Sequence, residues 1–199
     1  MSVSALLVVA AMMFQSGVDS TGTAIARPIG DVKQEETTGS YFQMFEFYGR
    51  PPHTWEHAQA MVSGYVYKSR PGRLAHIKTS SIHYFLLLNF PDLHSKKAWI
   101  GLGAECNKKA DIMWADGSLL KNQSFRAWNE GTLKKISRSC RAAKDSGKFF
   151  PVYYDSHELG LRWETNSPKG NLQYMVVEFA QPEEEPKADE EQTSVPDDK

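Results

Sequence analysis

The chain has 199 residues, of which 41% are hydrophobic and 12% aromatic, and its formal net charge is −1. This length allows one domain of about 130 to 150 residues with flanking segments, and the composition excludes a chain too polar to form a core. The charge is uneven, because residues 181–199 hold eight acids and two lysines while the rest carries a net charge of +5. This balance gives no reason to expect a nucleic-acid partner.

The first predicted element is the apolar segment 5–14, with the sequence ALLVVAAMMF. Ten residues are too few to span a bilayer, which takes about 20, but they match the core of a secretory signal peptide. Small residues suited to cleavage follow at Val18-x-Ser20 and at Ala24-Ile25-Ala26. No Lys or Arg precedes the segment, so a disordered or mitochondrial leader is the alternative. We expect residues 1–26 to be a signal peptide and the mature chain to be secreted, without membrane insertion.

Residues 27–40 are polar and predict a linker, so we expect the domain over 41–180. The aromatic segment 41–48 predicts a first strand. Apolar residues at helical spacing predict a helix over 55–67 that Thr54 caps. The alternating segment 73–77 predicts a short strand with Leu74 and Ile77 facing the core.

Ser80 or Ser81 is predicted to cap a second helix, which ends at Asn89, just before Pro91. A buried strand follows at 99–102, and the next strand ends in Trp114. Further strands are expected at 149–154, 159–164 and 174–179. This order predicts an α+β fold whose helices pack on small antiparallel sheets. The acidic, proline-containing residues 181–199 predict a disordered tail.

Five short segments carry the most specific signal in the chain. They are TWEHA at 54–58, GRLAHI at 72–77, AWIGL at 98–102, WADG at 114–117 with Phe125 and Trp128 behind it, and QYMVVEF at 173–179. In this order they resemble the C-type lectin-like domain family over residues 41–179. The resemblance implies the C-type lectin-like fold, with two helices, small antiparallel sheets and a long loop region.

The calcium-dependent lectins of this family bind the ion with two motifs that this chain lacks. Their Glu-Pro-Asn tripeptide aligns with Thr132-Leu133-Lys134, and their Trp-Asn-Asp aligns with Trp163-Glu164-Thr165. Calcium takes 6–8 oxygen ligands, with carboxylates prominent among them, and a lysine repels it. The resemblance therefore implies a recognition module that binds a protein or glycan through its long loops without calcium. The alternative is a calcium-dependent carbohydrate-binding lectin with substituted ligands. No other metal or cofactor is expected.

The candidate ligand contacts lie where the family's ligand face would be. They are Trp128, Asn129, Glu130, Lys134, Lys135, Arg138, Trp163 and Glu164. The two tryptophans, with Tyr153 and Tyr154, would stack on sugar rings or support the loop core. The cations, with Arg141, Lys144 and Lys148, would attract an anionic glycan, an acidic protein or the acidic tail, or would form the solvated side of a helix.

The chain lacks the family's usual disulfides, because its first helix and last strand hold no cysteine. Cys106 and Cys140 either pair across the central loops, or both stay reduced and buried, with Cys140 on a short helix. Asn122-Gln123-Ser124 is a glycosylation sequon if the chain is secreted by a eukaryote.

Catalytic motifs are absent from the sequence. There is no G-x-S-x-G, no H-E-x-x-H, no P-loop and no Gly-rich dinucleotide turn. The segment CRAAK at 140–144 does not resemble the redox-cysteine sequence of the formylglycine-generating enzymes, which have a related fold. We expect no enzymatic activity.

Overall fold

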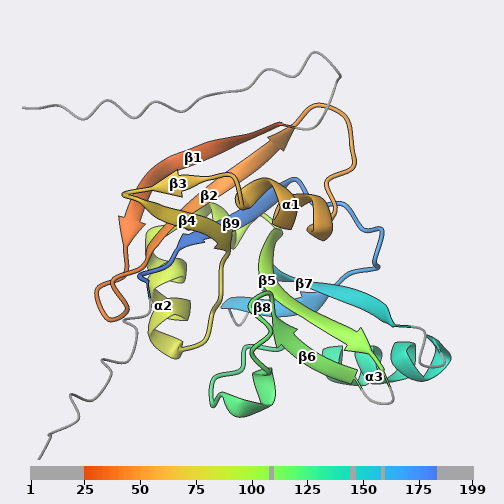
Figure 1. The fold of residues 1–199 in the computed structure, drawn as a ribbon. Coiled ribbons are helices and arrows are strands. Elements are labelled where there is room, and N and C mark those ends of the chain that lie inside the picture. The colour runs from red at the N-terminus through yellow and green to blue at the C-terminus, as the bar shows by residue number, and fades with distance from the viewer. Residues whose placement is uncertain (1–24, 108–109, 144–146, 158–159, 183–199) are drawn as a thin grey trace, which may run out of the picture.

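The computed structural model describes residues 25–107, 110–143, 147–157 and 160–182. Figure 1 labels the strands and α-helices, and two short 3-10 helices, η1 and η2, complete the order. The elements are β1 (Ile25–Gln34), β2 (Tyr41–Tyr48), α1 (Trp55–Val62), β3 (Val66–Tyr67), β4 (Arg70–Leu74), α2 (Ser80–Asn89), η1 (Pro91–His94), β5 (Ala98–Cys106), β6 (Ala110–Trp114), η2 (Leu120–Asn122), α3 (Thr132–Ala143), β7 (Lys148–His157), β8 (Gly160–Thr165) and β9 (Tyr174–Phe179).

Strand β9 joins the two halves of the sheet. It pairs antiparallel with β2 and β4, and parallel with β5 through Ala98↔Tyr174 and Trp99↔Met175. The order is β1-β2-β9-β5-β7-β8, with β3 on β4 and β6 on β5. The buried AWIGL segment is thus the start of β5, beside the last strand of the chain.

Helices α1 and α2 cover opposite faces of β2 and β9. Neighbouring residues of a strand point to opposite faces, and the buried residues divide accordingly. The set on the α2 side includes Phe42, Met44, Val176, Ile82 and Leu86. The set on the α1 side includes Phe45, Phe47, Met175, Val177, Ala58 and Val62.

The helix starts follow from side-chain caps. The Thr54 hydroxyl accepts a hydrogen bond from the His57 amide at 3.3 Å, as predicted. The cap of α2 is Thr79, which accepts from the Ile82 amide at 3.3 Å, so the prediction of Ser80 or Ser81 is wrong. Ser81 instead donates to the Glu35 carboxylate in the β1–β2 turn at 2.7 Å, which ties α2 to that turn.

Three predicted segments differ from the structure. Residues 27–34 belong to strand β1 and not to a linker, because β1 pairs antiparallel with β2. The first helix ends at Val62 and not at residue 67, since Ser63 and Gly64 form a turn before β3. The strand predicted at 73–77 is shifted to Arg70–Leu74, although Leu74 and Ile77 are fully buried as expected.

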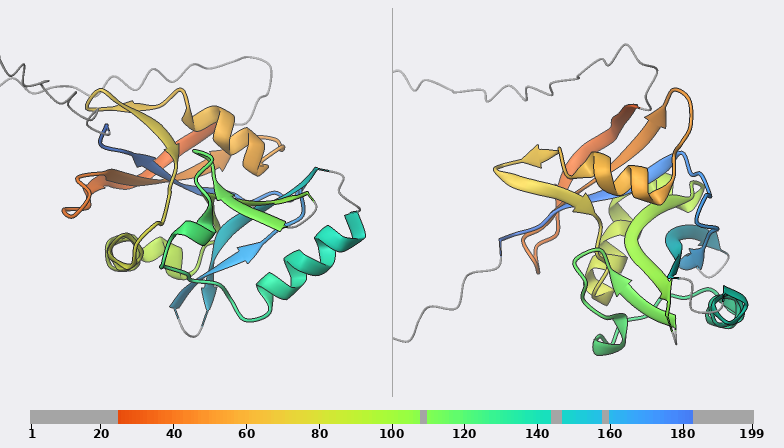
Figure 2. Two further views of the ribbon diagram at one scale, coloured as in Figure 1. Left: turned by 60° about the horizontal axis from the view of Figure 1, so that its bottom comes forward. Right: turned by 45° about the vertical axis from the view of Figure 1, so that its right-hand side comes forward.

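The α+β class is confirmed, with two corrections to its detail. The described residues contain three α-helices, because α3 lies within the region that was expected to form long loops. The sheet is mixed and not purely antiparallel, because β5 and β9 run parallel. Figure 2 shows α3 on the outer side of the β5–β8 half, away from α1 and α2.

The expected flanking segments fall mostly outside the described residues. Residues 1–24 of the expected signal peptide and 183–199 of the expected tail are not described. The last two residues of the expected signal peptide, Ile25 and Ala26, lie in β1 and pair with Tyr48 and Phe47.

Candidate functional site

Trp163 is the centre of the loop region and has no exposed surface. Three aromatic rings contact it edge to face, with centroid distances of 5.7 Å to Trp114, 5.6 Å to Phe125 and 5.3 Å to Trp128. Edge-to-face packing is favourable between aromatic rings. Of the two roles left open for Trp163, support of the loop core agrees with this packing and stacking on a sugar does not, because a sugar cannot reach a ring that is enclosed on all sides.

The same conclusion holds for the two tyrosines of β7. Tyr154 is fully buried and its hydroxyl lies 3.0 Å from Nδ1 of His83, while Tyr153 is 7% exposed. Both rings pack in the core and are not available to a ligand. Trp128, by contrast, is only half-buried, so one part of it lies at the surface.

Backbone hydrogen bonds fix the loop that carries Trp128 and Asn129 onto strand β8. The Trp163 amide donates to the Ala127 carbonyl at 2.6 Å, and the Asn129 amide donates to the Trp163 carbonyl at 2.9 Å. The loop is thereby held like an added strand, and its side chains have defined positions beside Glu164.

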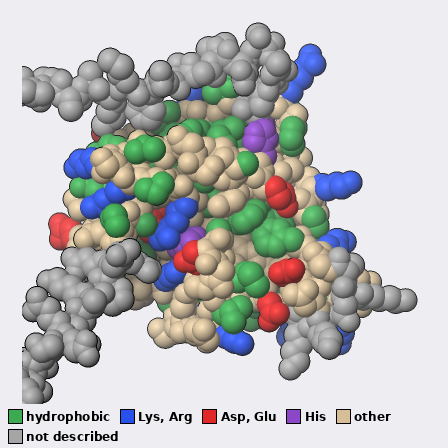
Figure 3. Space-filling model, in the orientation of Figure 1, with side chains coloured by type: hydrophobic (Ala, Val, Ile, Leu, Met, Phe, Trp, Pro, Cys, Tyr) green, Lys and Arg blue, Asp and Glu red, His purple; other side chains and the backbone are tan. Residues whose placement is uncertain are grey.

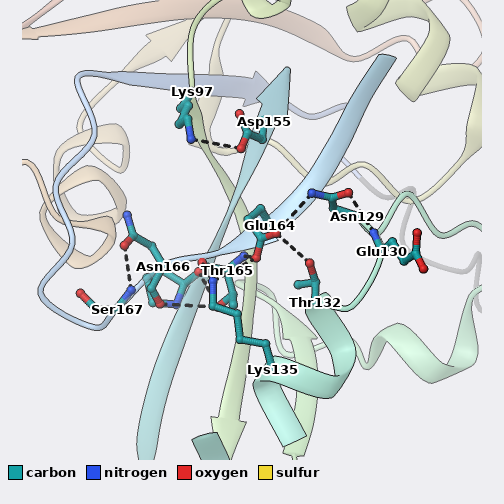
Figure 4. Close-up of polar contacts among 11 residues, drawn as sticks. Lys97, Asn129, Glu130, Thr132, Lys135, Asp155, Glu164, Thr165, Asn166 and Ser167 are labelled. Carbon is teal, nitrogen blue, oxygen red and sulfur yellow. Dashed lines mark hydrogen bonds and ion pairs between the residues drawn. The ribbon is translucent and has the colours of Figure 1, made fainter. Parts of the chain in front are cut away.

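The Glu164 carboxylate accepts hydrogen bonds from side chains of the loop and of α3 (Figure 4). The Thr132 hydroxyl donates to it at 2.9 Å and the Asn129 amide nitrogen at 3.5 Å. The Lys135 ammonium lies 3.3 Å from its other oxygen, which also accepts the Thr165 amide at 2.9 Å. Burial opposes ionisation of Glu164, but these hydrogen bonds and the lysine charge outweigh it and lower the pKa of the carboxyl.

This arrangement makes Glu164 a poor ligand for calcium. Glu164 is the one carboxylate in the two aligned motifs, and both of its oxygens already accept hydrogen bonds from the protein. Lys135 places a positive charge where a cation would have to approach. Across the described ranges, no three His, Cys, Asp or Glu side chains are grouped so that they could hold a metal ion.

Glu130 and Lys134 lie beside this cluster without joining it. Both are exposed, and the Glu130 backbone amide donates to the Asn129 side-chain oxygen at 2.9 Å. Of the eight predicted ligand contacts, the structure brings Asn129, Lys135 and Glu164 together. The remaining five are separate from that cluster or buried.

A pocket of about 280 Å³ lies next to this cluster, between β6, η2 and the start of α3. Its apolar wall is formed by Ile112, Leu119, Leu120, Trp128 and Leu133, and three charged residues line it as well, Asp111, Lys121 and Arg126. Leu133 is 48% exposed, so its side chain presents apolar surface to a ligand at this pocket. The pocket can hold an apolar group with charged groups around it.

Most of the pocket was not predicted from the sequence. Only Trp128 is among the expected ligand contacts. Of the other lining residues, Ile112 belongs to a predicted strand, and Leu119, Lys121 and Arg126 fall in a segment without periodicity. Arg126 donates to the Leu120 carbonyl and holds the η2 turn, a contact for which the sequence has no local pattern.

Helix α3 lies along the other side of the pocket and is anchored to the sheet. Ile136 and Cys140 pack on Ala104, Cys106 and Phe150. Cys106 and Cys140 form a disulfide, with their Cα atoms 4.9 Å apart. Cys140 is thus both on a helix and bonded, which combines features of the two alternatives left open by the sequence.

The glycosylation sequon lies at the edge of the pocket. Asn122 is exposed at the end of η2, directly after the pocket residue Lys121. Gln123 is anchored, since its side-chain oxygen accepts the Trp114 indole hydrogen bond at 2.8 Å. Asn122 is therefore accessible to a modifying enzyme.

Two solved structures of snake C-type lectin-like proteins are similar to this chain. EMS16, described as an antagonist of the collagen receptor integrin alpha2beta1, is 17% identical, with a TM-score of 0.44 over 75% of this chain and 97% of EMS16. Rhodocetin is 13% identical, with a TM-score of 0.41 over 77% of this chain and 94% of rhodocetin. The likeness is one of fold. At these identities and scores, neither structure says anything about the ligand of this chain.

Comparisons of the sequence itself identify no relative. No protein-family model and no curated protein matches the chain. Among the helices that the structure describes, none has the length and hydropathy needed to cross a bilayer.

Proposed function

We propose that this chain is a non-catalytic recognition module of C-type lectin-like fold that binds its ligand at the loop pocket without calcium. The observation that carries the proposal is the pocket itself, with Trp128 and the half-exposed Leu133 on its apolar wall. Apolar and aromatic side chains at the centre of a binding site supply most of its affinity.

The pocket lining favours a protein ligand over a sugar. Four aliphatic residues and one tryptophan form its wall, which suits a hydrophobic side chain of a partner better than a hydroxyl-rich ring. Lys121 and Arg126 lie at the same pocket and would pair with acidic groups beside that side chain.

Calcium independence rests on the Glu164 cluster. A cation at this carboxylate would have to displace the Lys135 ammonium and the Thr132 hydroxyl. The Thr132 hydroxyl would lose its acceptor and Lys135 would lose its ion pair, so ion binding at this carboxylate costs free energy.

Secretion is part of the proposal. The disulfide between Cys106 and Cys140 suits an oxidising compartment, and residues 1–26 have the composition of a signal peptide. In a eukaryotic source, a glycan on Asn122 would then lie at the edge of the pocket.

The pocket is tested with a displayed peptide library. We expect the full mature chain to select peptides with a hydrophobic anchor residue, and Leu133→Asp to lose at least about 90% of that binding, which corresponds to about 1.4 kcal/mol. Leu88→Asp is the matched control, because Leu88 is 80% exposed on α2, a helix that contributes no residue to the pocket lining. Selected peptides that bind Leu133→Asp as well as the wild type would refute a ligand site at this pocket.

A glycan array with and without a calcium chelator tests the alternative, a calcium-dependent lectin. We expect no chelator-sensitive signal, and no shift of the melting temperature when millimolar calcium is added. An ion that binds only the folded state would raise that temperature. A chelator-sensitive glycan signal would favour the lectin.

A further inference from the structure

Helix α3 presents a row of cations that the proposed pocket does not use. Lys134, Arg138 and Arg141 are all exposed. At 100° per residue their positions fall within about 60° of arc, and they span about 10 Å of helix. The row therefore forms one linear face and not a scattered set of charges.

No acid neutralises this row within the described part of the chain. The ion pairs formed there involve other cations, and α3 itself has no acidic residue. Lys135 shows the contrast, since it is on the same helix but is paired with Glu164 at 3.3 Å. Three adjacent cations without an acidic partner among the described residues repel one another, so an anion that binds all three relieves that repulsion.

The row is held on a rigid support. Ile136 and Cys140 are buried beneath it, and the disulfide ties Cys140 to β5. Lys148 of β7 lies across from Cys106 and places a further exposed cation near the same end of the helix. The charges are positioned before a ligand arrives, which reduces the entropy lost on binding.

The face of the β5–β6 pair opposite α3 carries acidic side chains. On the face of the sheet opposite α3, Glu105 lies across from Asp111. Figure 3 shows that side, with acidic side chains beside a hydrophobic patch. These two carboxylates disfavour a polyanion at their own position, whereas α3 has no acidic residue along the cation row.

We propose that the Lys134–Arg138–Arg141 row binds a sulfated polysaccharide. Guanidinium groups pair with tetrahedral oxyanions through two parallel hydrogen bonds, and two of the three cations are arginines. The exposed residues that flank the row on α3 are Ser137 and Ala142, so the row itself lacks a large apolar anchor. A protein interface normally needs such an anchor, whereas a sulfated sugar chain offers only sulfates, carboxylates and hydroxyls.

The test measures binding of a fluorescent heparin oligosaccharide to the full chain by anisotropy, at several NaCl concentrations. The variant is Lys134→Ser/Arg138→Ser/Arg141→Ser. We expect about tenfold weaker binding at low salt and a shallower dependence of affinity on salt, because fewer counterions are released. All three side chains are exposed, so the variant should keep the melting temperature of the wild type.

A charge-matched variant serves as control. Lys33→Ser/Arg50→Ser/Lys169→Ser removes the same charge from β1 and two loops, at exposed residues without an ion pair in the described chain. We expect it to bind heparin like the wild type. If both variants bind heparin equally weakly, the proposal for the row is refuted and net charge alone explains the binding.

Two further outcomes would also overturn the proposal. The first is a wild-type chain that does not bind the oligosaccharide at low salt. The second is a glutamate-rich peptide of equal negative charge that competes as well as heparin, which would assign the row to an acidic protein. Neither outcome affects the pocket, because that proposal is tested by Leu133→Asp.

Discussion

The ammonium group of Lys135 lies 3.3 Å from both a Glu164 carboxylate oxygen and the Thr165 carbonyl oxygen. This lysine is one residue beyond the tripeptide that aligns with the family's Glu-Pro-Asn motif. Its positive charge thus satisfies the carboxylate that would otherwise be the best candidate for an ion. The hydrogen bonds at Glu164 tie the start of α3 to strand β8.

Lys135→Ala and Glu164→Ala should have unequal effects on stability. The Lys135 side chain is 60% exposed, so its removal should lower the free energy of unfolding by less than about 1 kcal/mol. Glu164 is 16% exposed and accepts from the buried Thr132, so its loss should cost about 2 kcal/mol. Urea denaturation measures the free energy of unfolding of both variants. A larger loss for Lys135→Ala than for Glu164→Ala would contradict this prediction.

Reduction of the disulfide should destabilise the α3 half of the fold. Cys106 and Cys140 are 34 residues apart in sequence, and a loop of that length corresponds to about 3–4 kcal/mol in the chain-entropy model. We expect Cys106→Ser/Cys140→Ser to unfold at a lower denaturant concentration than the wild type. Added reductant should then affect the wild type alone. A variant as stable as the oxidised wild type would show that the bond does not support α3.

Two buried histidines should make the protein sensitive to mild acid. His76 and His83 are 1% and 5% exposed. Burial, together with the charge of Arg73, lowers the pKa of His76 to about 3, and burial with the charge of Arg162 lowers the pKa of His83 to about 4. Unfolded histidine titrates near pH 6.5. The unfolded chain therefore takes up protons below that pH while the folded chain does not, so stability falls.

The window of this effect runs from pH 6.5 down to about 4 for His83 and about 3 for His76, and above pH 4.5 the histidines act without Glu35. We expect the free energy of unfolding to fall by about 1–2 kcal/mol per histidine at pH 5. The carboxyl of Glu35 acts at lower pH. Burial opposes its ionisation, but hydrogen bonds led by Ser81 and Thr38 lower its pKa to about 2, so its contribution is lost only below about pH 4.5. His83→Gln should reduce the slope between pH 6.5 and 4.5, and an unchanged slope would exclude His83 as a cause.

The start of strand β1 limits where a signal peptide could be cleaved without loss of paired residues. Ile25 and Ala26 pair with β2, and the guanidinium of Arg27 lies 3.2 Å from the centre of the Tyr48 ring. Cleavage after Ala26 would remove two paired residues, whereas cleavage after Ser20 keeps the strand whole. Mass spectrometry of the chain secreted by expressing cells should give a mature N-terminus ahead of Ile25. A chain that starts at Arg27 would contradict this expectation.

Local pattern was sufficient for most of the scaffold. The aromatic segment of β2, the Thr54 cap and the apolar residues of β9 each act over a few positions, so their periodicity identifies them without a structure. The short motifs around Trp99 and Trp114 pointed to the fold for the same reason. Packing around these residues requires similar side chains wherever the fold occurs.

The folded chain decided what happens at the site, because long-range contacts have no local signature. Glu35 and Ser81 are 46 residues apart, and their hydrogen bond turns a polar segment expected to be a linker into an anchored strand end. The sequence left Trp163 with either a ligand role or a core role, and three aromatic neighbours from other segments decide for the core. The pocket at Leu133 exists only because η2, β6 and α3 meet there. Burial of the apolar residues beneath these elements stabilises their arrangement.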